Sequence, residues 1–246
     1  MNKVFFHKEY HSKKNTNSHI IFICDHATNV IEKKYKNLGL KNKTIKTHIA
    51  WDIGAKKISL LLAKNLMQSC FFSNFSRLLI DPNRSKKSGD LIIKRSFEQL
   101  IPGNLKITKQ DRLYRIKKYY DVYHDGLNKF IKKKSVIYKN IYLISIHSFT
   151  KTSNNFDRGV EIGLLWNKKI ELFLKIKNSL LKKKIHIGNN YPYSGYLYNF
   201  TLDKHSKNGY LNNISIEIRN DLICNPKGIK RISKILNDVL IELLNG

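Results

Sequence analysis

Apolar residues recur along this chain with two spacings, one typical of buried strands and the other typical of helices that bury one side. Five short segments are mostly apolar, which is the pattern of strands covered on both faces. These segments are residues 19–24, 71–75, 78–80, 141–146 and 160–165. Residues 213–219 alternate instead, so we expect their isoleucines on one side of a strand and Ser215, Glu217 and Arg219 on the other.

Four longer segments carry apolar residues three or four positions apart, which is the period of an amphipathic helix. They are residues 53–68, 108–131, 168–181 and 227–244. Thr108 followed three residues later by Asp111 is a capping pattern, and it predicts where the second of these helices starts. Residues 191–209 are rich in Asn, Tyr, Gly and Ser and have little helical period, so we expect a loop or insertion there.

Predicted strands and helices alternate along the chain. The connections are long enough to hold helices, so the order predicts an α/β protein with a mainly parallel or mixed sheet covered on both faces. We find no internal repeat and no flexible linker, and a length of 246 residues fits one large domain. We therefore expect a single domain over residues 1–246.

The composition narrows the class of protein. Hydrophobic residues make up 41% of the chain, which excludes a disordered basic tail, because such tails lack the apolar mass to offset their ordering entropy. No apolar run approaches the roughly 18–20 residues that a membrane-spanning helix needs. The three cysteines are far apart, which suits a reducing compartment, and the N-terminus lacks the pattern of a secretory signal. We expect a cytoplasmic protein without a membrane partner.

Positive charge is the most extreme property of the sequence, because 46 Lys and Arg against 18 Asp and Glu give a net charge of +28. This charge favours weak binding to polyanions at low salt and makes a nucleic-acid-binding protein an alternative. Only eight of the cations are arginine, the residue that nucleic-acid recognition favours, and the lysines are scattered along the chain. We therefore expect no specific nucleic-acid ligand.

Candidate catalytic and metal-binding residues lie at the ends of the predicted strands, where ligands bind in open α/β sheets. Asp25 and His26 follow the first apolar segment, and His147 follows residues 141–146. Glu217 lies in the alternating strand. If these strands are parallel neighbours, two imidazoles and several carboxylates converge on one edge of the sheet.

The two histidines have a structural and a functional interpretation. Either one alone is typical of a hydrogen-bonded residue in a loop. On two strand ends with carboxylates nearby, His26 and His147 together suit a zinc site, because zinc prefers imidazole and carboxylate ligands. Glu217 could form an ion pair, but a carboxylate on a central strand is costly to bury and therefore favours a functional role.

Two further groups accompany these candidates. Asp52 lies four residues after His48 and just before the first predicted helix, so it either ligates a metal or favours the helix N-terminus. Arg77 and Arg84 bracket the third apolar segment in a chain that has few arginines. This placement suggests a clamp for a carboxylate or phosphate.

Seven short motifs follow one another along most of the chain, from about Ile20 to Ile223. They are CDHATN (residues 24–29), HIAWDIGA (48–55), SRLLIDPNRS (76–85), IPGN (101–104), ISIHSFT (144–150), NNYPYSG (189–195) and IEIRNDLI (216–223). In this order they resemble the N-formylglutamate amidohydrolase family. Residues 158–163 (RGVEIG) keep the general form of that family's pattern but not every residue.

The resemblance implies a fold and an activity. The family is similar to zinc-dependent exopeptidases, so we expect a three-layer α/β/α core and hydrolysis of an amide bond to an acidic amino acid. His26 and His147 would be the imidazole ligands of one zinc ion. Asp52 would be the carboxylate ligand, with Asp25 and His48 as alternatives. Glu217 would be the general base that takes a proton from the attacking water.

The resemblance also implies roles on the substrate side. Asn83 and Arg84 would hold a substrate carboxylate, and Arg77 would assist them. Arg219 shares a face of its strand with the general base and would hold a second carboxylate. His205, in the polar segment, would steady the oxyanion.

The function that we predict is zinc-dependent hydrolysis of a small, anionic N-acyl amino acid such as N-formylglutamate. One alternative is an amidase that acts on peptide-like or cell-wall fragments, although the lack of a secretion signal weighs against the wall. The other is a basic nucleic-acid-binding protein, whose affinity would fall with salt and survive chelation. Loss of activity on chelation and its return with zinc would distinguish the hydrolase.

Overall fold

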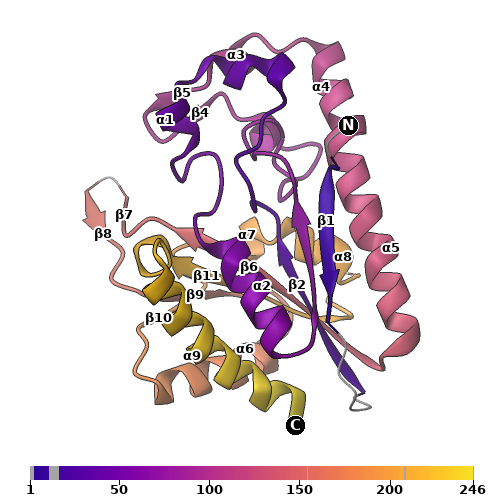
Figure 1. Cartoon of the computed structure of the whole chain (residues 1–246), viewed down its shortest axis with the longest axis vertical. Coiled ribbons are helices and arrows are strands. Elements are labelled where there is room, and N and C mark those ends of the chain that lie inside the picture. The colour runs from indigo at the N-terminus through magenta and orange to yellow at the C-terminus, as the bar shows by residue number, and fades with distance from the viewer. Residues whose placement is uncertain (1–2, 11–16, 154, 208, 246) are drawn as a thin grey trace.

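A computed structural model of the chain describes residues 3–10, 17–153, 155–207 and 209–245. A seven-stranded sheet runs through the centre of the molecule (Figure 1). From edge to edge, its strands are β1 (Phe5–Glu9), β3 (Ser69–Ser73), β2 (Ser18–Cys24), β6 (Asn140–Phe149), β11 (Asn212–Arg219), β9 (Ile162–Leu165) and β10 (Ile187–Asn189).

The sheet is mixed, with a parallel centre. Strands β3, β2, β6 and β11 are parallel neighbours. Strand β1 runs antiparallel to β3, and β9 runs antiparallel to β11, while β10 is parallel to β9. The alternation of elements in the sequence predicted this mixed type of sheet.

One face of the sheet carries a layer of three helices (Figure 1). Alternate strand residues such as Phe22 and Ile214 point to this face and pack with the apolar sides of the helices. The helices are α2 (Ala55–Asn65), α6 (Ile170–Lys182) and α9 (Pro226–Asn245).

The opposite face carries one long helical segment. Ile21 and Ile23, which alternate with Phe22 along β2, pack there with Tyr123 and Leu127. The segment consists of α4 (Lys109–Arg115), π-helical turns over Ile116–Asp121 and α5 (Val122–Ile137). Because helices cover both faces, the fold is a three-layer α/β/α sandwich, and the expected fold class is confirmed.

Short elements complete the chain and gather in part at one end of the molecule, around α1 and α3 (Figure 1). The short helices are α1 (Asn42–Ile45), α3 (Pro102–Leu105), α7 (Gly195–Tyr198) and α8 (Phe200–His205). The 3-10 turns are Lys33–Gly39, Gly89–Ile92 and Asn220–Leu222. Two small hairpins pair β4 (Arg95–Ser96) with β5 (Gln99–Leu100) and β7 (Thr152–Ser153) with β8 (Phe156–Asp157).

Two predictions about local structure were wrong. Residues 78–80 are fully buried but form turns instead of a strand, since Leu79 N donates to Ser76 O. Their apolar character reflects burial against the second helical layer, and burial alone does not distinguish a strand from a turn. The segment 191–209 contains α7 and α8, which are too short to show a helical period.

The parallel centre positions the candidate residues. The carboxyl ends of β2, β6 and β11 meet at one edge, and the β11 residue Glu217 pairs in register with His147 of β6. Among the helices of the described residues, none is both long and apolar enough to cross a bilayer.

Candidate active site

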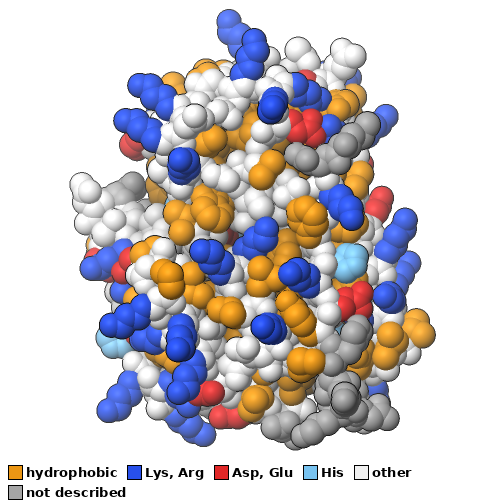
Figure 2. Space-filling model, in the orientation of Figure 1, with side chains coloured by type: hydrophobic (Ala, Val, Ile, Leu, Met, Phe, Trp, Pro, Cys, Tyr) orange, Lys and Arg blue, Asp and Glu red, His pale blue; other side chains and the backbone are white. Residues whose placement is uncertain are grey.

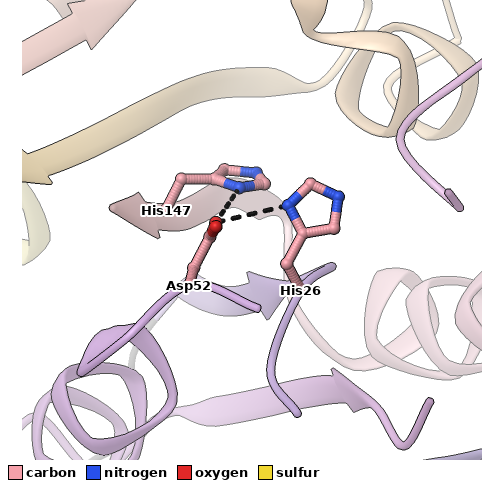
Figure 3. Close-up of side chains that lie close together, drawn as sticks. All are labelled: His26, Asp52 and His147. Carbon is pink, nitrogen blue, oxygen red and sulfur yellow. Dashed lines mark hydrogen bonds and ion pairs between the residues drawn. The ribbon is translucent and has the colours of Figure 1, made fainter. Parts of the chain in front are cut away.

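Three buried side chains point toward one another at the carboxyl edge of the sheet (Figure 3). Asp52 Oδ2 lies 2.8 Å from His147 Nδ1 and 3.3 Å from His26 Nδ1. These three atoms lie within 4.8 Å of one another, so the group could hold a metal ion. We call His26, Asp52 and His147 the His–Asp–His cluster.

The fold brings the cluster together from three elements. His26 lies two residues beyond the end of β2, and His147 lies near the carboxyl end of β6. Asp52 precedes α2, and its backbone N–H donates to the carbonyl of His26 at 2.9 Å. Gly54 follows it with φ of +86°, in close contact with Ile223 O, so this turn requires a residue without a side chain.

The outward ring nitrogens of both histidines also have partners. His26 Nε2 lies 2.8 Å from Asp81 Oδ1, and His147 Nε2 lies 2.9 Å from Ser145 Oγ and 3.5 Å from Asp25 Oδ2. A carboxylate accepts hydrogen bonds, so Asp81 orients the His26 ring with its Nδ1 toward Asp52. Contacts of this kind to the far nitrogen are typical of histidines that ligate metals.

Asp25 is a fixed support behind His147. Its Oδ1 accepts hydrogen bonds from the hydroxyls of Tyr123 at 2.7 Å and Thr201 at 2.9 Å. Burial by itself would raise the pKa of Asp25, but its contacts with His147 lower it. Asp25 therefore stays ionised beside the imidazole.

Opposite charges share the buried cluster. Burial would raise the pKa of Asp52, but the two histidines hold it well below its usual range. Burial would conversely lower the pKa of His147, and contacts with Asp25 and Asp52 raise it well above its usual value. The site therefore stabilises positive charge between its carboxylates.

Glu217 lies beside the cluster and is only 7% exposed. Its Oε2 is buried and has no hydrogen-bond partner among the described residues. Burial raises the pKa of Glu217 to about 7, with a further contribution from Asp52 and an opposing one from His147. A carboxyl group with a pKa near neutrality can both accept and release a proton, which is the property of a general acid–base.

A cavity of about 210 Å³ opens onto the His–Asp–His cluster and Glu217. Its wall mixes basic, amide and aromatic side chains, including Phe97 from the turn between β4 and β5. The other wall residues important to the chemistry are Arg77, Asn83, Arg84, Tyr193 and Tyr198. The cavity is of a size for a small polar molecule.

Comparison with known proteins places this arrangement in a family. The sequence profile described as N-formylglutamate amidohydrolase matches residues 18–224. The chain belongs to the N-formylglutamate amidohydrolase family. The family predicted from the seven motifs is thereby confirmed, and with it the general class of amide hydrolase. No functionally curated protein matches the chain in sequence.

Solved structures share the fold of this member of the N-formylglutamate amidohydrolase family. The gene product Atu2144 from Agrobacterium tumefaciens is 28% identical with a TM-score of 0.91, over 99% of this chain and 96% of that chain. The N-formylglutamate amidohydrolase from Ralstonia eutropha JMP134 is 16% identical with a TM-score of 0.71, over 98% and 97%. The similarity in fold thus extends over nearly the full length of each chain.

Of the three candidates for the third metal ligand in this N-formylglutamate amidohydrolase family member, Asp52 is the one in the cluster. Asp25 lies on the far side of the His147 ring. His48 lines the cavity, but its Nδ1 is 3.9 Å from Asp52 Oδ1. Burial lowers the pKa of His48 to about 4, so its ring is neutral near pH 7.

Of the four predicted carboxylate-binding residues, Arg77, Asn83 and Arg84 line the cavity, but their side chains are not equally available to a substrate. Arg77 is paired with Asp81 at 3.0 Å. The Asn83 amide is engaged at both ends, since its Nδ2 donates to Tyr198 O and its Oδ1 accepts from Thr201 N. Arg84 has no carboxylate partner among the described residues, so its guanidinium is available for a substrate anion.

Two predicted site residues of this family member lie outside the cavity wall. Arg219 Nε donates to Asp221 Oδ1 at 2.8 Å, and Arg219 is not among the residues that line the cavity. The ring of His205 in α8 lies 2.9 Å from His124 Nδ1 in a buried pair. Each of these two side chains is held by a structural partner. This geometry therefore does not support contact of Arg219 or His205 with a substrate in the cavity.

Sequence reasoning missed three residues that shape the site. Asp81 was assigned no role of its own, although it supports His26. Tyr193 and Tyr198 lie in the segment expected to be a loop, yet both line the cavity. The motif NNYPYSG, which contains Tyr193, was the one signal in the sequence that pointed to this segment.

Proposed function

We propose that the protein is a zinc-dependent amidohydrolase that cleaves the amide bond of a small N-acyl acidic amino acid, of which N-formylglutamate is the reference substrate. The observation that carries the proposal is the buried His–Asp–His cluster next to Glu217, whose Oε2 accepts no hydrogen bond from the residues that the structure describes. Family membership supports the reaction class. The cluster supplies the cofactor site and the glutamate supplies the base.

The residues fit a zinc ion. Two imidazole nitrogens and one carboxylate oxygen are the ligand types that zinc prefers, and a catalytic site keeps a fourth position open. The outward nitrogens bonded to Asp81 and Ser145 leave both Nδ1 atoms directed at Asp52. Bound there, zinc would polarise the scissile carbonyl and lower the pKa of water.

Glu217 is proposed to move the proton. Its carboxylate accepts a proton from the attacking water and then donates it to the leaving amine, so that water is added across the C–N bond. Arg77 is held by Asp81 next to the cluster and contributes positive charge beside the reacting carbonyl. Because the cavity is partly buried, these charges are weakly screened by solvent.

The cavity supports a small anionic substrate. Arg84 is proposed to bind a substrate carboxylate, and its guanidinium lies over the Tyr198 ring at 5.1 Å from the ring centre. Asn83 is proposed to position Tyr198 and the start of α8 through the two hydrogen bonds of its side-chain amide. The volume of about 210 Å³ favours an N-acyl amino acid over a long cell-wall fragment.

The nucleic-acid alternative rests on charge alone. On the face drawn in Figure 2, Lys and Arg side chains are interspersed with apolar and uncharged ones instead of forming one stripe. This distribution supports the view that the excess lysine is a property of the surface as a whole. The positive field would assist the approach of an anionic substrate.

Metal analysis combined with a substrate panel tests the proposal. Protein purified without chelators should carry about one zinc per chain. It should hydrolyse N-formyl-L-glutamate in preference to N-acetyl-L-glutamate, N-succinyl-L-glutamate or a muramyl peptide. A chelator should abolish turnover, and zinc should restore it. Activity that survives complete removal of metal would contradict the zinc mechanism, and a preference for the muramyl peptide would favour the cell-wall alternative.

A pair of histidine variants locates the metal. His147→Ala should lose bound zinc and activity, because it removes one cluster ligand. His186→Ala changes an exposed histidine and is the matched control, which should keep both. Thermal unfolding of the two variants would distinguish loss of the site from loss of the fold.

A further inference from the structure

Two arginines and two tyrosines form a continuous row, and three of its members, Arg84, Tyr198 and Tyr193, line the cavity. The Arg84 guanidinium lies 5.1 Å from the centre of the Tyr198 ring, and the Tyr198 and Tyr193 ring centres are 5.8 Å apart in an edge-to-face arrangement. The Arg158 guanidinium lies 5.1 Å from the centre of the Tyr193 ring. We call Arg84, Tyr198, Tyr193 and Arg158 the Arg–Tyr row.

Each end of the row is a cation without a carboxylate partner among the described residues. The other arginines near this edge are neutralised, since Arg77 pairs with Asp81 and Arg219 pairs with Asp221. Arg158 is half-buried and also lies over Phe149, the last residue of β6. Two unneutralised cations at the ends of one row fit a substrate that has two negative groups.

The hydrogen bond between Arg158 and Tyr193 sets the direction of the tyrosine proton. Arg158 Nη1 donates to the Tyr193 hydroxyl oxygen at 3.1 Å. A guanidinium can only donate, so the hydroxyl is the acceptor in this contact. The hydroxyl proton must therefore point elsewhere, and no described residue accepts it. Burial and the Glu217 carboxylate raise the pKa of Tyr193, so the phenol keeps this proton.

Close packing holds Tyr193 in place. The backbone of Tyr191 and the ring of Pro192 lie against Gly163, the β9 residue that pairs in register with Glu217. Tyr191 O also lies directly over Gly188 of β10, where a side chain would collide with it. Two glycines thus let the chain approach the sheet beside the general base, which brings the next residue, Tyr193, to the cavity wall.

We propose that Tyr193 is a specificity-determining residue whose hydroxyl donates to the side-chain carboxylate of an acidic N-acyl amino acid, and that Arg158 is the positioning residue that directs this proton into the cavity. The inference rests on the proposed function. Arg84, at the other end of the row, binds the α-carboxylate. The pair of anchors then distinguishes glutamate from glutamine, which has the same shape and no side-chain charge.

Selectivity between N-formyl-L-glutamate and N-formyl-L-glutamine is the test, measured as kcat/KM for each substrate with zinc-loaded enzyme. Tyr193→Phe removes only the hydroxyl and should lower kcat/KM for the glutamate substrate about 10- to 100-fold, as expected for loss of a hydrogen bond to a charged group. The loss for the glutamine substrate should stay below about 3-fold. Arg158→Met should shift the same ratio in the same direction. Tyr196→Phe, at a tyrosine 57% exposed on α7, should change neither value.

Two results would overturn the inference. Equal losses on both substrates would mean that the hydroxyl contacts the amide or α-carboxylate that they share, and unchanged kcat/KM for both would mean that it contacts neither substrate. Calorimetry with L-glutamate and L-glutamine gives a measurement that does not need turnover. If wild-type enzyme turns over no N-formyl amino acid, the proposed function is wrong. If Tyr193→Phe binds L-glutamate with unchanged affinity, only the role of Tyr193 is wrong.

Discussion

Two groups of charged residues in this molecule are built in opposite ways. On the outer strand β1, Glu9 accepts hydrogen bonds from Lys134 Nζ at 2.7 Å and Lys133 Nζ at 3.2 Å. At the carboxyl edge of the sheet, Asp52 Oδ1 and Glu217 Oε2 are buried and have no hydrogen-bond partner among the described residues. In the first group the carboxylate is hydrogen-bonded within the fold. In the second group some carboxylate oxygens accept no hydrogen bond from the described residues.

This difference distinguishes a structural group of charges from a candidate functional one. An unpartnered buried carboxylate oxygen costs free energy, so a protein retains one where a ligand or a reaction uses it. The His–Asp–His cluster and Glu217 fit this description, and the Glu9 group does not. Substitutions at the cavity should therefore change activity or metal affinity more than stability, while substitutions at Glu9 should do the reverse.

The largest effect is expected at Glu217, the proposed general base. Glu217→Gln should lower kcat about 10²- to 10⁴-fold, because the amide cannot accept the proton. The free energy of unfolding should not fall, since an isosteric neutral group replaces a partly unsatisfied buried carboxyl. Steady-state kinetics, zinc content and urea unfolding on the same sample measure all three quantities.

Glu161→Gln is the matched control, because Glu161 lies outside the cavity and pairs with Arg231. It should leave kcat unchanged. Wild-type turnover in Glu217→Gln would show that the base has been assigned to the wrong residue.

A smaller effect is expected at the residue that supports His26. Asp81→Asn removes the negative charge 2.8 Å from His26 Nε2 and should weaken zinc affinity about 10- to 100-fold. Competition with a chromophoric chelator measures the change. Asp90→Asn, at an exposed aspartate, is the control that should bind zinc as the wild type does. Equal affinity in the two variants would remove Asp81 from the metal-supporting network.

The smallest effect is expected on β1, and it should appear in stability alone. Glu9→Gln leaves the buried ammonium of Lys134 without its carboxylate and should lower the free energy of unfolding by about 1–2 kcal/mol near neutral pH. Activity of the folded enzyme should not change. Urea unfolding and kinetics at one pH measure both.

The pH dependence of this effect has a definite sign. Although burial opposes it, Lys134 and Lys133 lower the pKa of Glu9 from 4.5 to about 2 in the folded protein. The stabilisation is therefore complete above about pH 4.5 and is lost as the pH falls toward 2. The difference between wild type and Glu9→Gln should shrink over this range, and a constant difference would contradict the ion pair.

Local patterns predicted the elements that have their own period or length. The apolar run at residues 141–146 is within β6, and the alternation at 213–219 is within β11. Thr108 caps α4 as its sequence pattern indicates, since its hydroxyl accepts from Asp111 N at 3.0 Å. The apolar run at 78–80 was misassigned because burial in a turn leaves the same pattern as burial in a strand.

The candidate site was likewise predictable only in part. His26, Asp52, His147 and Glu217 follow strand ends or alternate within a strand, so their convergence could be expected from the order of elements and the family motifs. The partner of Arg219 could not be predicted in that way. Arg219 shares a strand face with Glu217, but in the structure its Nε donates to Asp221, only two residues away.

The sequence by itself determined the α/β class, the family and the residue types at the carboxyl edge of the sheet, because hydrophobic period and motif order are local properties. Tertiary structure alone decided which of these side chains remain free. Whether Arg84 or Arg77 is available depends on Asp81, and the direction of the Tyr193 proton depends on Arg158, 35 residues away in sequence. Contacts that form only in the folded chain, some between distant segments and some between near neighbours, decide which polar atoms have partners, and the hydrophobic period does not encode them.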